Sequence, residues 1–474
     1  MLLSVCLDDM IPSKHAVRVI DKVVDQIVSQ NKELFEEYRE NQAGRPSYHQ
    51  SIMIKLFLYG YFNGIKSSRK LEAETQRNLE VMWLLGELKP DHWTISNYRK
   101  EHGKEIKYIT KQIRRFLKEN GYIKLEEVAI DGTKIKAYAN REVLTINKIN
   151  SKLENIETKI EEYITKLDEE DSSEDIDEAI DRDGIEPTKK KYVDEIAGLV
   201  KQIETLRKQK EIMETEQKAY MSATDNDANL MKTREGSIPA YNVQMAVDAE
   251  HKMVVATEVV TEETDYNMLP VMVKSVKEEV GDIPDTVIAD TGYAKLDLIQ
   301  EIEKREPGIE TFVAVNAEKH EEITFTYDKE KDEYVCSQGK RLILAEKNKK
   351  QRGSLTNLYK GTECGNCPIK DQCTISKNRS KTRYHNQEWR DQYISKMRSV
   401  LAKKMLVLRM STAEHPFGTI KCLMGKIPLL LRGIKKVPIE INLYSTAYNL
   451  KRLFNIEEFG FLMGLIAEFN WKAA

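Results

Sequence analysis

The sequence predicts a mixed α/β fold, and three observations carry this prediction. Residues 1–120 show apolar side chains at helical spacing. Short apolar runs typical of strands then appear as separate islands near residues 126, 241, 285 and 310. A helical pattern, LDLIQEIEKRE, lies between the last two islands, as in a βαβ crossover. We therefore expect an α/β core with helical segments before, within and after it.

Changes in this pattern divide the chain into parts. Ile and Leu recur at helical spacing on both sides of the acidic stretch DEEDSSEDIDEAIDRDGIEP, which predicts an antiparallel helical hairpin. The later cysteines mark a second insert. The predicted parts are an N-terminal all-helical domain (1–120), core strands (121–140 and 221–324), a helical-hairpin or coiled-coil insert (141–220), a small Cys-rich insert (325–385) and C-terminal helices (386–474).

Charge is distributed unevenly along the 474 residues, although the net charge is only −3. Residues 161–186 hold 13 acidic and 2 basic side chains, whereas residues 341–440 hold 22 basic and 7 acidic ones. This asymmetry indicates a polyanionic partner for the C-terminal half, with a merely solvated basic surface as the alternative. No apolar run reaches the roughly 18 residues of a membrane span, and the start is too short for a signal peptide. We expect a cytoplasmic protein without a membrane partner.

The N-terminal helices carry basic residues between them, among them Arg69 and Arg99. Short helices with interspersed bases resemble a helix-turn-helix-like DNA-binding module. A helical dimerisation or packing domain explains the same composition equally well.

Three acids stand out by their surroundings. Asp131 ends VAID and Asp290 ends TVIAD, and each precedes a small residue and a glycine turn. Glu414 lies in a helical stretch between Arg409 and Lys421. Open sheets place ligand-binding groups at strand ends. Carboxylates there can hold two Mg²⁺ or Mn²⁺ ions for in-line phosphoryl transfer.

Each acid also has an ordinary structural reading, because Asp caps turns and Glu on a helix is normally solvated. Asp225, Asp248 and Asp265 also lie near strands. We do not rank them as metal ligands ahead of the three chosen acids.

The cysteines between residues 336 and 373 predict a structural zinc site. Cys364, Cys367 and Cys373 follow one another closely, and Cys336 lies upstream in YVCSQGK. Four thiolates are a common ligand set for tetrahedral Zn²⁺, and the CxxC pair forms half of such a site. Reduced cysteines without a role are the alternative. The polar stretch NKKQRGSLTNLYKGTE between them is expected to be loop or short strand.

Four motifs appear in a fixed order: VAIDGTKIKAYAN, YNVQMAVDAEHKMVVATEV, VIADTGYA and STAEHPFGTIK. In this order they resemble bacterial insertion-sequence transposases with a DDE catalytic triad, and the eleven-eighty-two group resembles the chain most. GRPSYHQSIMIKLFLYGYFNG and PDHWTISNYRK are similar to the N-terminal helical domain of these enzymes. The resemblance covers most of the chain.

The resemblance implies an RNase-H-like catalytic core. Asp131 would lie on its first strand, Asp290 after a later strand and Glu414 on a C-terminal helix. Lys421 matches a basic residue that lies near the DNA in these enzymes. A related signature has Tyr and Arg seven and four places before the Glu; those places hold Val407 and Met410 here, and Arg409 is displaced by one. A role for Arg409 is therefore in doubt.

The function implied is that of a transposase that cuts the ends of its element and joins them to target DNA with two Mg²⁺ or Mn²⁺ ions. Its partners would be double-stranded DNA, as terminal inverted repeats and target, and a second copy of the chain in a homodimer. An RNase-H-like nuclease without strand transfer, or an inactive sequence-specific DNA-binding relative, are the alternatives. The side chains expected to contact DNA are Lys421, Arg409, Lys426, Arg432, Arg69 and Arg99.

Overall fold

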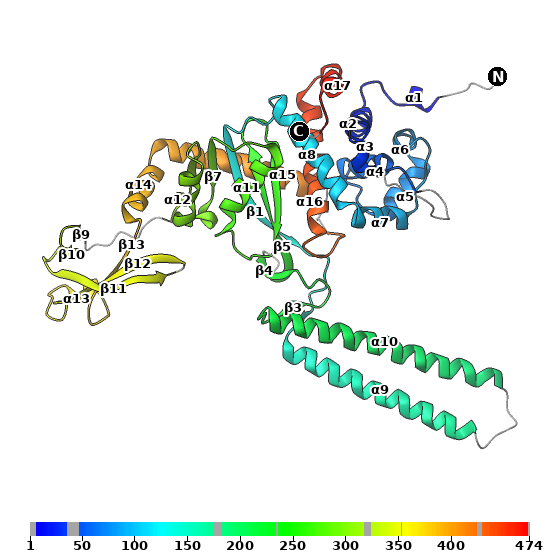
Figure 1. The fold of residues 1–474 in the computed structure, drawn as a ribbon, viewed down its shortest axis with the longest axis horizontal. Helices are drawn as coiled ribbons and strands as arrows, with labels where there is room; N and C mark the ends of the chain where they lie inside the picture. Colours follow the sequence, from blue (N-terminus) through cyan, green and yellow to red (C-terminus); the bar gives the residue numbers. More distant parts are fainter. Residues whose placement is uncertain are drawn as a thin grey trace.

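The structure is a computed structural model of the chain. It describes residues 6–35, 47–174, 182–233, 236–316, 324–351, 353–423 and 429–472. A central body of sheet and helices carries two projections, a long helical hairpin and a small second sheet (Figure 1).

The central sheet is built around its first strand, β1. β1 pairs antiparallel with β5 and parallel with β7, and β7 pairs parallel with β8. β5 also pairs antiparallel with β4 and β6. The mixed α/β fold predicted from the sequence is confirmed. The strands are β1 (Glu127–Lys136), β4 (Asn229–Thr233), β5 (Gly236–Asp248), β6 (Val254–Val260), β7 (Thr286–Ala289) and β8 (Glu310–Val313).

Helices cover this sheet, and one of them crosses most of its strands. α15 packs against β1, β5, β7 and β8, whereas α11 packs against β5 and β6, and α16 against β6. Gly281 ends α11 in a left-handed conformation, with φ 77°, which glycine adopts without steric cost. The helices are α11 (Met268–Val280), α12 (Leu296–Arg305), α14 (Gln387–Met397), α15 (Val400–Leu423), α16 (Val437–Ile456) and α17 (Phe459–Glu468).

The N-terminal region is helical, and the last helices of the chain complete its core. α16 packs on α4 and α8, and α17 packs on α2. The Tyr61 hydroxyl donates to Glu440, and the Trp471 ring stacks on Phe116 at 5.2 Å between ring centroids. The two ends of the chain thus share one apolar cluster. The helices are α1 (Leu7–Met10), α2 (Ala16–Gln30), α3 (Lys32–Phe35), α4 (Gln50–Phe62), α5 (Ser68–Arg77), α6 (Leu79–Leu84), α7 (His92–Glu101) and α8 (Gly103–Glu119).

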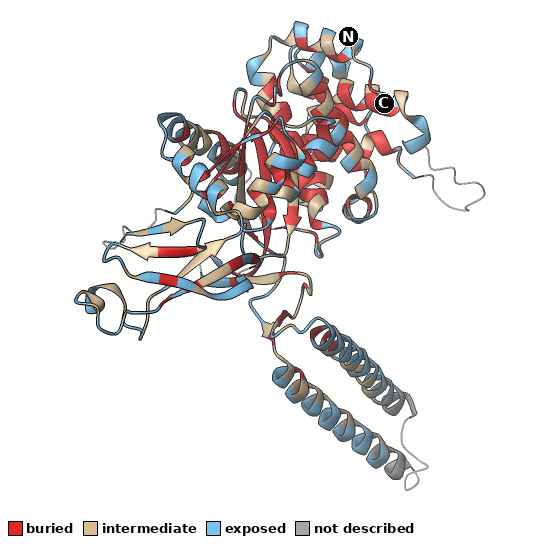
Figure 2. Ribbon diagram, turned by 60° about the vertical axis from the view of Figure 1, so that its left-hand side comes forward, coloured by how far each residue is buried: buried red, intermediate tan, exposed pale blue. Residues whose placement is uncertain are grey.

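Two long helices, α9 (Ile146–Glu174) and α10 (Arg182–Thr215), occupy the segment where the sequence predicts a helical hairpin. They lie side by side and project from the body (Figure 1). Most of their described residues are exposed (Figure 2). A small apolar cluster at the base joins them to β2 (Val143–Leu144) and β3 (Met221–Ser222).

The Cys-rich insert forms a second sheet, in the strand order β13-β12-β11-β10-β9. The expectation of loop or short strand for NKKQRGSLTNLYKGTE is wrong, because β11 and β12 form a long hairpin there. Most side chains of β11 are exposed, so its polar residues show no alternating apolar face. The elements are β9 (Phe325–Asp328), β10 (Glu333–Cys336), β11 (Arg341–Gln351), β12 (Ser354–Gly361), α13 (Lys370–Cys373) and β13 (Ser380–Tyr384).

Candidate active site

Asp131 lies in the middle of β1, directly after three fully buried apolar residues. β1 pairs with β5 from Val128 to Lys136, but with β7 only from Glu127 to Ala129. Asp131 therefore stands just beyond the parallel pairing, where two strands separate and leave room for polar side chains. Its Oδ1 accepts a 2.9 Å hydrogen bond from the backbone N–H of Gly132.

Asp290 directly follows β7 and begins the short 3₁₀ helix η1 (Thr291–Tyr293). Its Oδ1 accepts a 2.8 Å hydrogen bond from the backbone N–H of Gly292. The parallel register pairs Ala129 with Ile288. Asp131 lies two residues after Ala129 in β1, and Asp290 lies two residues after Ile288, just past the end of β7. The two strand-Asp motifs of the sequence thus end side by side.

Arg409, from α15, lies between these two carboxylates. Its Nη2 is 3.0 Å from Asp131 Oδ1 and 3.3 Å from Asp290 Oδ2. Burial raises the pKa of Asp131; the Arg409 charge opposes this rise, and the Asp290 carboxylate adds to it. A cation shared by two carboxylates lowers their mutual repulsion. The structure therefore brings Asp131 and Asp290 together and adds Arg409, whose role was in doubt on the sequence alone.

Glu414 lies on the same helix as Arg409, and its side chain is exposed. Among the described residues it forms no hydrogen bond or ion pair with either aspartate. The Lys421 ammonium donates to the Thr133 hydroxyl of β1 at 2.8 Å. Because residues seven apart share one side of a helix, Glu414 lies on the side of α15 that Lys421 turns toward β1. Among the described residues the third acid thus makes no polar contact with the pair.

The remaining basic residues predicted to bind DNA lie in different surroundings. Arg69 is exposed on α5. Arg432 is also exposed, and its guanidinium donates to the Tyr138 carbonyl at 3.0 Å and stacks on the Tyr138 ring. Lys426 lies outside the described residues.

Arg99 is a buried residue of the helical core, because its side chain is only 3% exposed. Its guanidinium donates to the Lys66 carbonyl at 2.9 Å and to the Tyr61 hydroxyl at 3.4 Å. A guanidinium enclosed in this way cannot reach a phosphate in the structure described. The expectation that Arg99 contacts DNA therefore has no support from its position.

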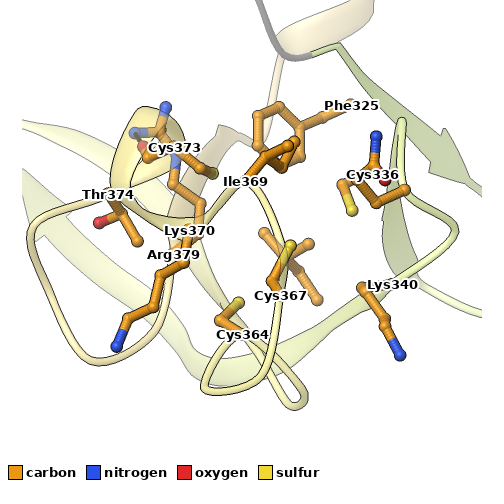
Figure 3. A pocket seen from close by; sticks show the side chains of 12 residues that line it. Phe325, Cys336, Lys340, Cys364, Cys367, Ile369, Lys370, Cys373, Thr374 and Arg379 are labelled. Carbon is orange, nitrogen blue, oxygen red and sulfur yellow. Dashed lines mark hydrogen bonds between the residues drawn. The ribbon is translucent and has the colours of Figure 1, made fainter.

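The four cysteines of the predicted zinc site line one cavity of about 20 Å³ in the second sheet (Figure 3). Cys336 ends β10, Cys364 and Cys367 lie in the turn after β12, and Cys373 ends α13. None of the four is in a disulfide. Burial raises the pKa of the Cys373 thiol, and the Arg379 charge opposes this rise.

Neither the carboxylates nor the cysteines are arranged with metal-binding geometry in this structure. Within the part of the chain that the structure describes, no group of three or more His, Cys, Asp or Glu side chains is arranged to hold a metal ion. At the carboxylates, Arg409 lies between the aspartates and Glu414 stands apart.

Asp265, which sequence reasoning ranked behind the chosen acids, lies next to the aspartate pair. A side chain added at Gly132 would meet its Oδ1, and one added at Gly292 would meet both its Oδ2 and Asp290 Oδ1. The signal in the sequence is indirect: the polar residues Asn242 and Gln244 alternate along the otherwise apolar strand β5. Both amides hydrogen-bond Asp265.

Two family models match the chain. Residues 5–101 match the transposase domain of DUF772, and residues 335–454 match the transposase DDE domain. These two segments are thus similar to transposase domains. The DDE domain match includes Arg409, Glu414, Lys421 and the four cysteines, but it begins well after Asp131 and Asp290. Together the matches relate the N-terminal helices and the C-terminal part of the chain to transposases.

Searches of curated proteins and of solved structures found no match. No helix among the described residues has both the length and the hydropathy that crossing a membrane requires.

Proposed function

We propose that the chain is a DNA transposase that cleaves insertion-sequence ends and joins them to target DNA. One observation carries the proposal. Asp131 in β1 and Asp290 just after β7 both contact the same nitrogen of Arg409, a residue of α15. The helix that supplies this nitrogen belongs to the segment that matches the DDE domain. The eleven-eighty-two group of insertion sequences remains our proposal for the closest relatives.

The donor set fits divalent metal ions. Carboxylate oxygens are the ligands that Mg²⁺ and Mn²⁺ prefer, and the Arg409 guanidinium shows that the Asp131–Asp290 pair accepts a cation. Asp131, Asp290 and Glu414 would hold two ions after Arg409 withdraws and the Glu414 side chain turns inward. The ions, when bound, would activate the attacking oxygen and stabilise the leaving oxygen of a phosphodiester.

The protein's own residues would position the DNA. The Lys421 ammonium, 2.8 Å from the Thr133 hydroxyl, would hold a phosphate close to β1, because a lysine provides a strong point charge for phosphate. Arg432 and Arg69 are exposed and would add phosphate contacts outside the acids. No nucleophilic side chain is required, since water and then a DNA 3′-hydroxyl would attack. Arg99 is not part of this proposal, because it is buried.

A strand-transfer assay tests this function. The full chain is mixed with Mg²⁺, a pre-cut terminal inverted repeat and a plasmid target, and joined products are counted. Asp131→Asn should lower joining by at least about a hundredfold, because charge stabilisation of this kind contributes that much to rate. Glu126→Gln, an exposed acid five residues earlier, is the matched control and should join normally.

The rival functions give different outcomes in the same assay. A nuclease would cut the DNA in Mg²⁺ but produce no joined product. An inactive DNA-binding relative would shift the DNA in a gel without cutting it. Cleavage by Asp131→Asn at the rate of the unchanged chain would overturn the assignment of the site.

We also propose a structural Zn²⁺ held by Cys336, Cys364, Cys367 and Cys373. The support is that four free thiols, from β10, the turn after β12 and α13, line one cavity (Figure 3). A side chain at Gly361 would overlap the Cys364 sulfur, so glycine there allows the sulfur to approach the sheet. Such a metal would hold the turn, α13 and β10 together in a small fold.

Synapsis of two DNA ends requires two active sites, so we propose a homodimer on DNA. The α9–α10 hairpin is the proposed contact, because it projects from the body (Figure 1) and exposes Ile164, Val193 and Val200. Light scattering with and without terminal DNA tests this: a variant with all three changed to Ser should stay monomeric on DNA. A variant that still forms dimers would contradict the hairpin contact.

A further inference from the structure

Three acids near strands were set aside on sequence alone, and the structure gives two of them structural partners. The Asp248 carboxylate accepts the backbone N–H groups of Lys124 and Leu125 at 2.9 and 3.0 Å. The Asp225 carboxylate accepts the Tyr241 hydroxyl at 2.9 Å. Asp265 differs, because its partners are side-chain amides that lie beside the aspartate pair.

Two buried amides fix one oxygen of Asp265. Oδ1 accepts from Asn242 Nδ2 at 2.7 Å and from Gln244 Nε2 at 2.6 Å. Gln244 is held in turn by Asn242 Oδ1, at 3.0 Å, and by the hydroxyl of the buried Tyr293. Asn242 and Gln244 are 1% and 0% exposed, and amides buried on a core strand are costly unless they are bonded. They are arranged to hold the Asp265 carboxylate in one orientation.

The Asp265 carboxylate lies close to Gly132 and Gly292, the glycines that follow Asp131 and Asp290 in the sequence. A Cβ at Gly292 would stand 3.4 Å from Asp265 Oδ2 and 2.9 Å from Asp290 Oδ1. A Cβ at Gly132, next to Asp131, would stand 2.8 Å from Asp265 Oδ1. Because both glycines lack a side chain, these carboxylates can approach the same small region closely.

The charges of the side chains around these glycines do not cancel. Arg409 pairs with Asp131 and Asp290. Among the described residues, Asp265 forms no ion pair, and no hydrogen bond is formed by its Oδ2. Three carboxylates and one guanidinium leave an excess of negative charge, which a divalent cation would neutralise.

We propose that Asp265 is a further ligand of the divalent metal ions, on the side of Asp290 away from α15. The inference rests on the proposed function, because it adds a carboxylate to the same metal centre. Asn242 and Gln244 would act through Asp265, as hydrogen-bonding partners that orient a metal ligand. Four carboxylates would then serve two ions, with Asp265 already held in place while Glu414 stands apart.

Mn²⁺ binding to the full chain without DNA tests the inference, measured by titration calorimetry. Asp265→Asn keeps an oxygen for the two amides but removes the charge. We expect its Kd for Mn²⁺ to rise at least about tenfold. Glu262→Gln, an exposed acid three residues earlier, is the matched control and should bind Mn²⁺ as the unchanged chain does.

Thermal unfolding separates ligation from a merely structural role. Without metal, Asp265→Asn should keep or raise the Tm, because it removes a repelling charge. The rise in Tm on adding Mn²⁺ should shrink. Gly292→Ala supplies a second variant that leaves Asp265 intact and fills the space between the carboxylates; it should also weaken Mn²⁺ binding.

The outcomes distinguish the inference from the proposed function. Normal Mn²⁺ affinity in Asp265→Asn and Gly292→Ala, with binding lost in Asp131→Asn, would overturn the role of Asp265 alone. Normal affinity in Asp131→Asn as well, or no Mn²⁺ binding by the unchanged chain, would count against the metal centre as a whole.

Discussion

Arg409 places a single nitrogen, Nη2, 3.0 Å from Asp131 Oδ1, and the same nitrogen lies 3.3 Å from Asp290 Oδ2. The guanidinium therefore stands where a metal ion would meet both carboxylates, and protein cation and metal ion compete for this place. The competition makes Arg409 testable independently of DNA.

Arg409→Gln should increase the affinity for Mn²⁺ several-fold, because the competing cation is gone. Without metal the same variant should unfold more easily, by about 1 kcal/mol, since the pair is partly exposed and screened. Calorimetry and thermal unfolding measure the two effects. Lys404→Gln, an exposed residue of the same helix, is the control. Unchanged Mn²⁺ affinity in Arg409→Gln would refute the competition.

Gly132→Ala should destabilise the fold by about 1–3 kcal/mol, the usual effect of overpacking. The new methyl would overlap the Gln244 amide and stand 2.8 Å from Asp265 Oδ1. Urea unfolding measures the loss. Gly198→Ala is the control, because it lies in α10 with nothing near its Cβ position. It should be neutral or slightly stabilising, and equal behaviour of the two variants would argue against the close packing at Gly132.

Removal of one cysteine tests the zinc proposal. Protein purified without chelator should contain about one Zn²⁺ per chain by elemental analysis, and Cys364→Ser should contain none. Cys6→Ser, an exposed cysteine far from the cluster in sequence, should keep the metal. Absence of zinc from the unchanged chain would remove this site from the proposal.

Lowering the pH should weaken the contact between the second sheet and α12, because the Asp297 carboxylate of α12 becomes protonated. This α12 residue receives hydrogen bonds from Ser354, Arg390 and Asn386. Burial alone would raise the pKa of Asp297, but the bonds from Ser354 and Arg390 outweigh it and lower the pKa. A carboxyl with a lowered folded pKa stabilises fully above its unfolded pKa and loses this contribution as pH falls through the folded value.

We therefore expect the protection factors for hydrogen exchange in β12 and α14, taken relative to the intrinsic rate at each pH, to fall below about pH 4, which is near the ordinary pKa of Asp. Asp297→Asn should show faster exchange already at neutral pH and a weaker dependence on acid. The exposed acid Asp391 offers the control variant Asp391→Asn. Exchange in Asp297→Asn that matches the unchanged chain at every pH would show that this contact does not hold the sheet.

The sequence predicted the aspartate pair because both residues follow short apolar runs and precede glycine turns, a pattern that depends on local structure alone. Asp265 has no such pattern, since it lies in a loop before α11 and acquires its place only when Asn242 and Gln244 of β5 donate hydrogen bonds to its carboxylate. Arg409 could not be placed either, because spacing along a helix does not tell which side faces the sheet.

The sequence pattern also could not predict the burial of one charged residue, Arg99. Arg99 stands among bases in a polar stretch, yet α7 turns it into the helical core against Tyr61 and Lys66. The long β11–β12 hairpin was missed for the opposite reason: most of β11 is exposed, so no apolar alternation marks it. In each case tertiary contacts, not local pattern, decide the outcome.

The packing of α16 and α17 on the first helices has a consequence for synthesis. Trp471, which stacks on Phe116 and donates its indole N–H to the Ile466 carbonyl, is synthesised long after Phe116. Until then α4 and α8 lack the helices that cover them. A nascent or prematurely terminated chain would therefore expose apolar surface on its first helices and become a substrate for chaperones and proteases. Only a chain synthesised through α16 and α17 would offer a folded N-terminal region together with α15 and its arginine.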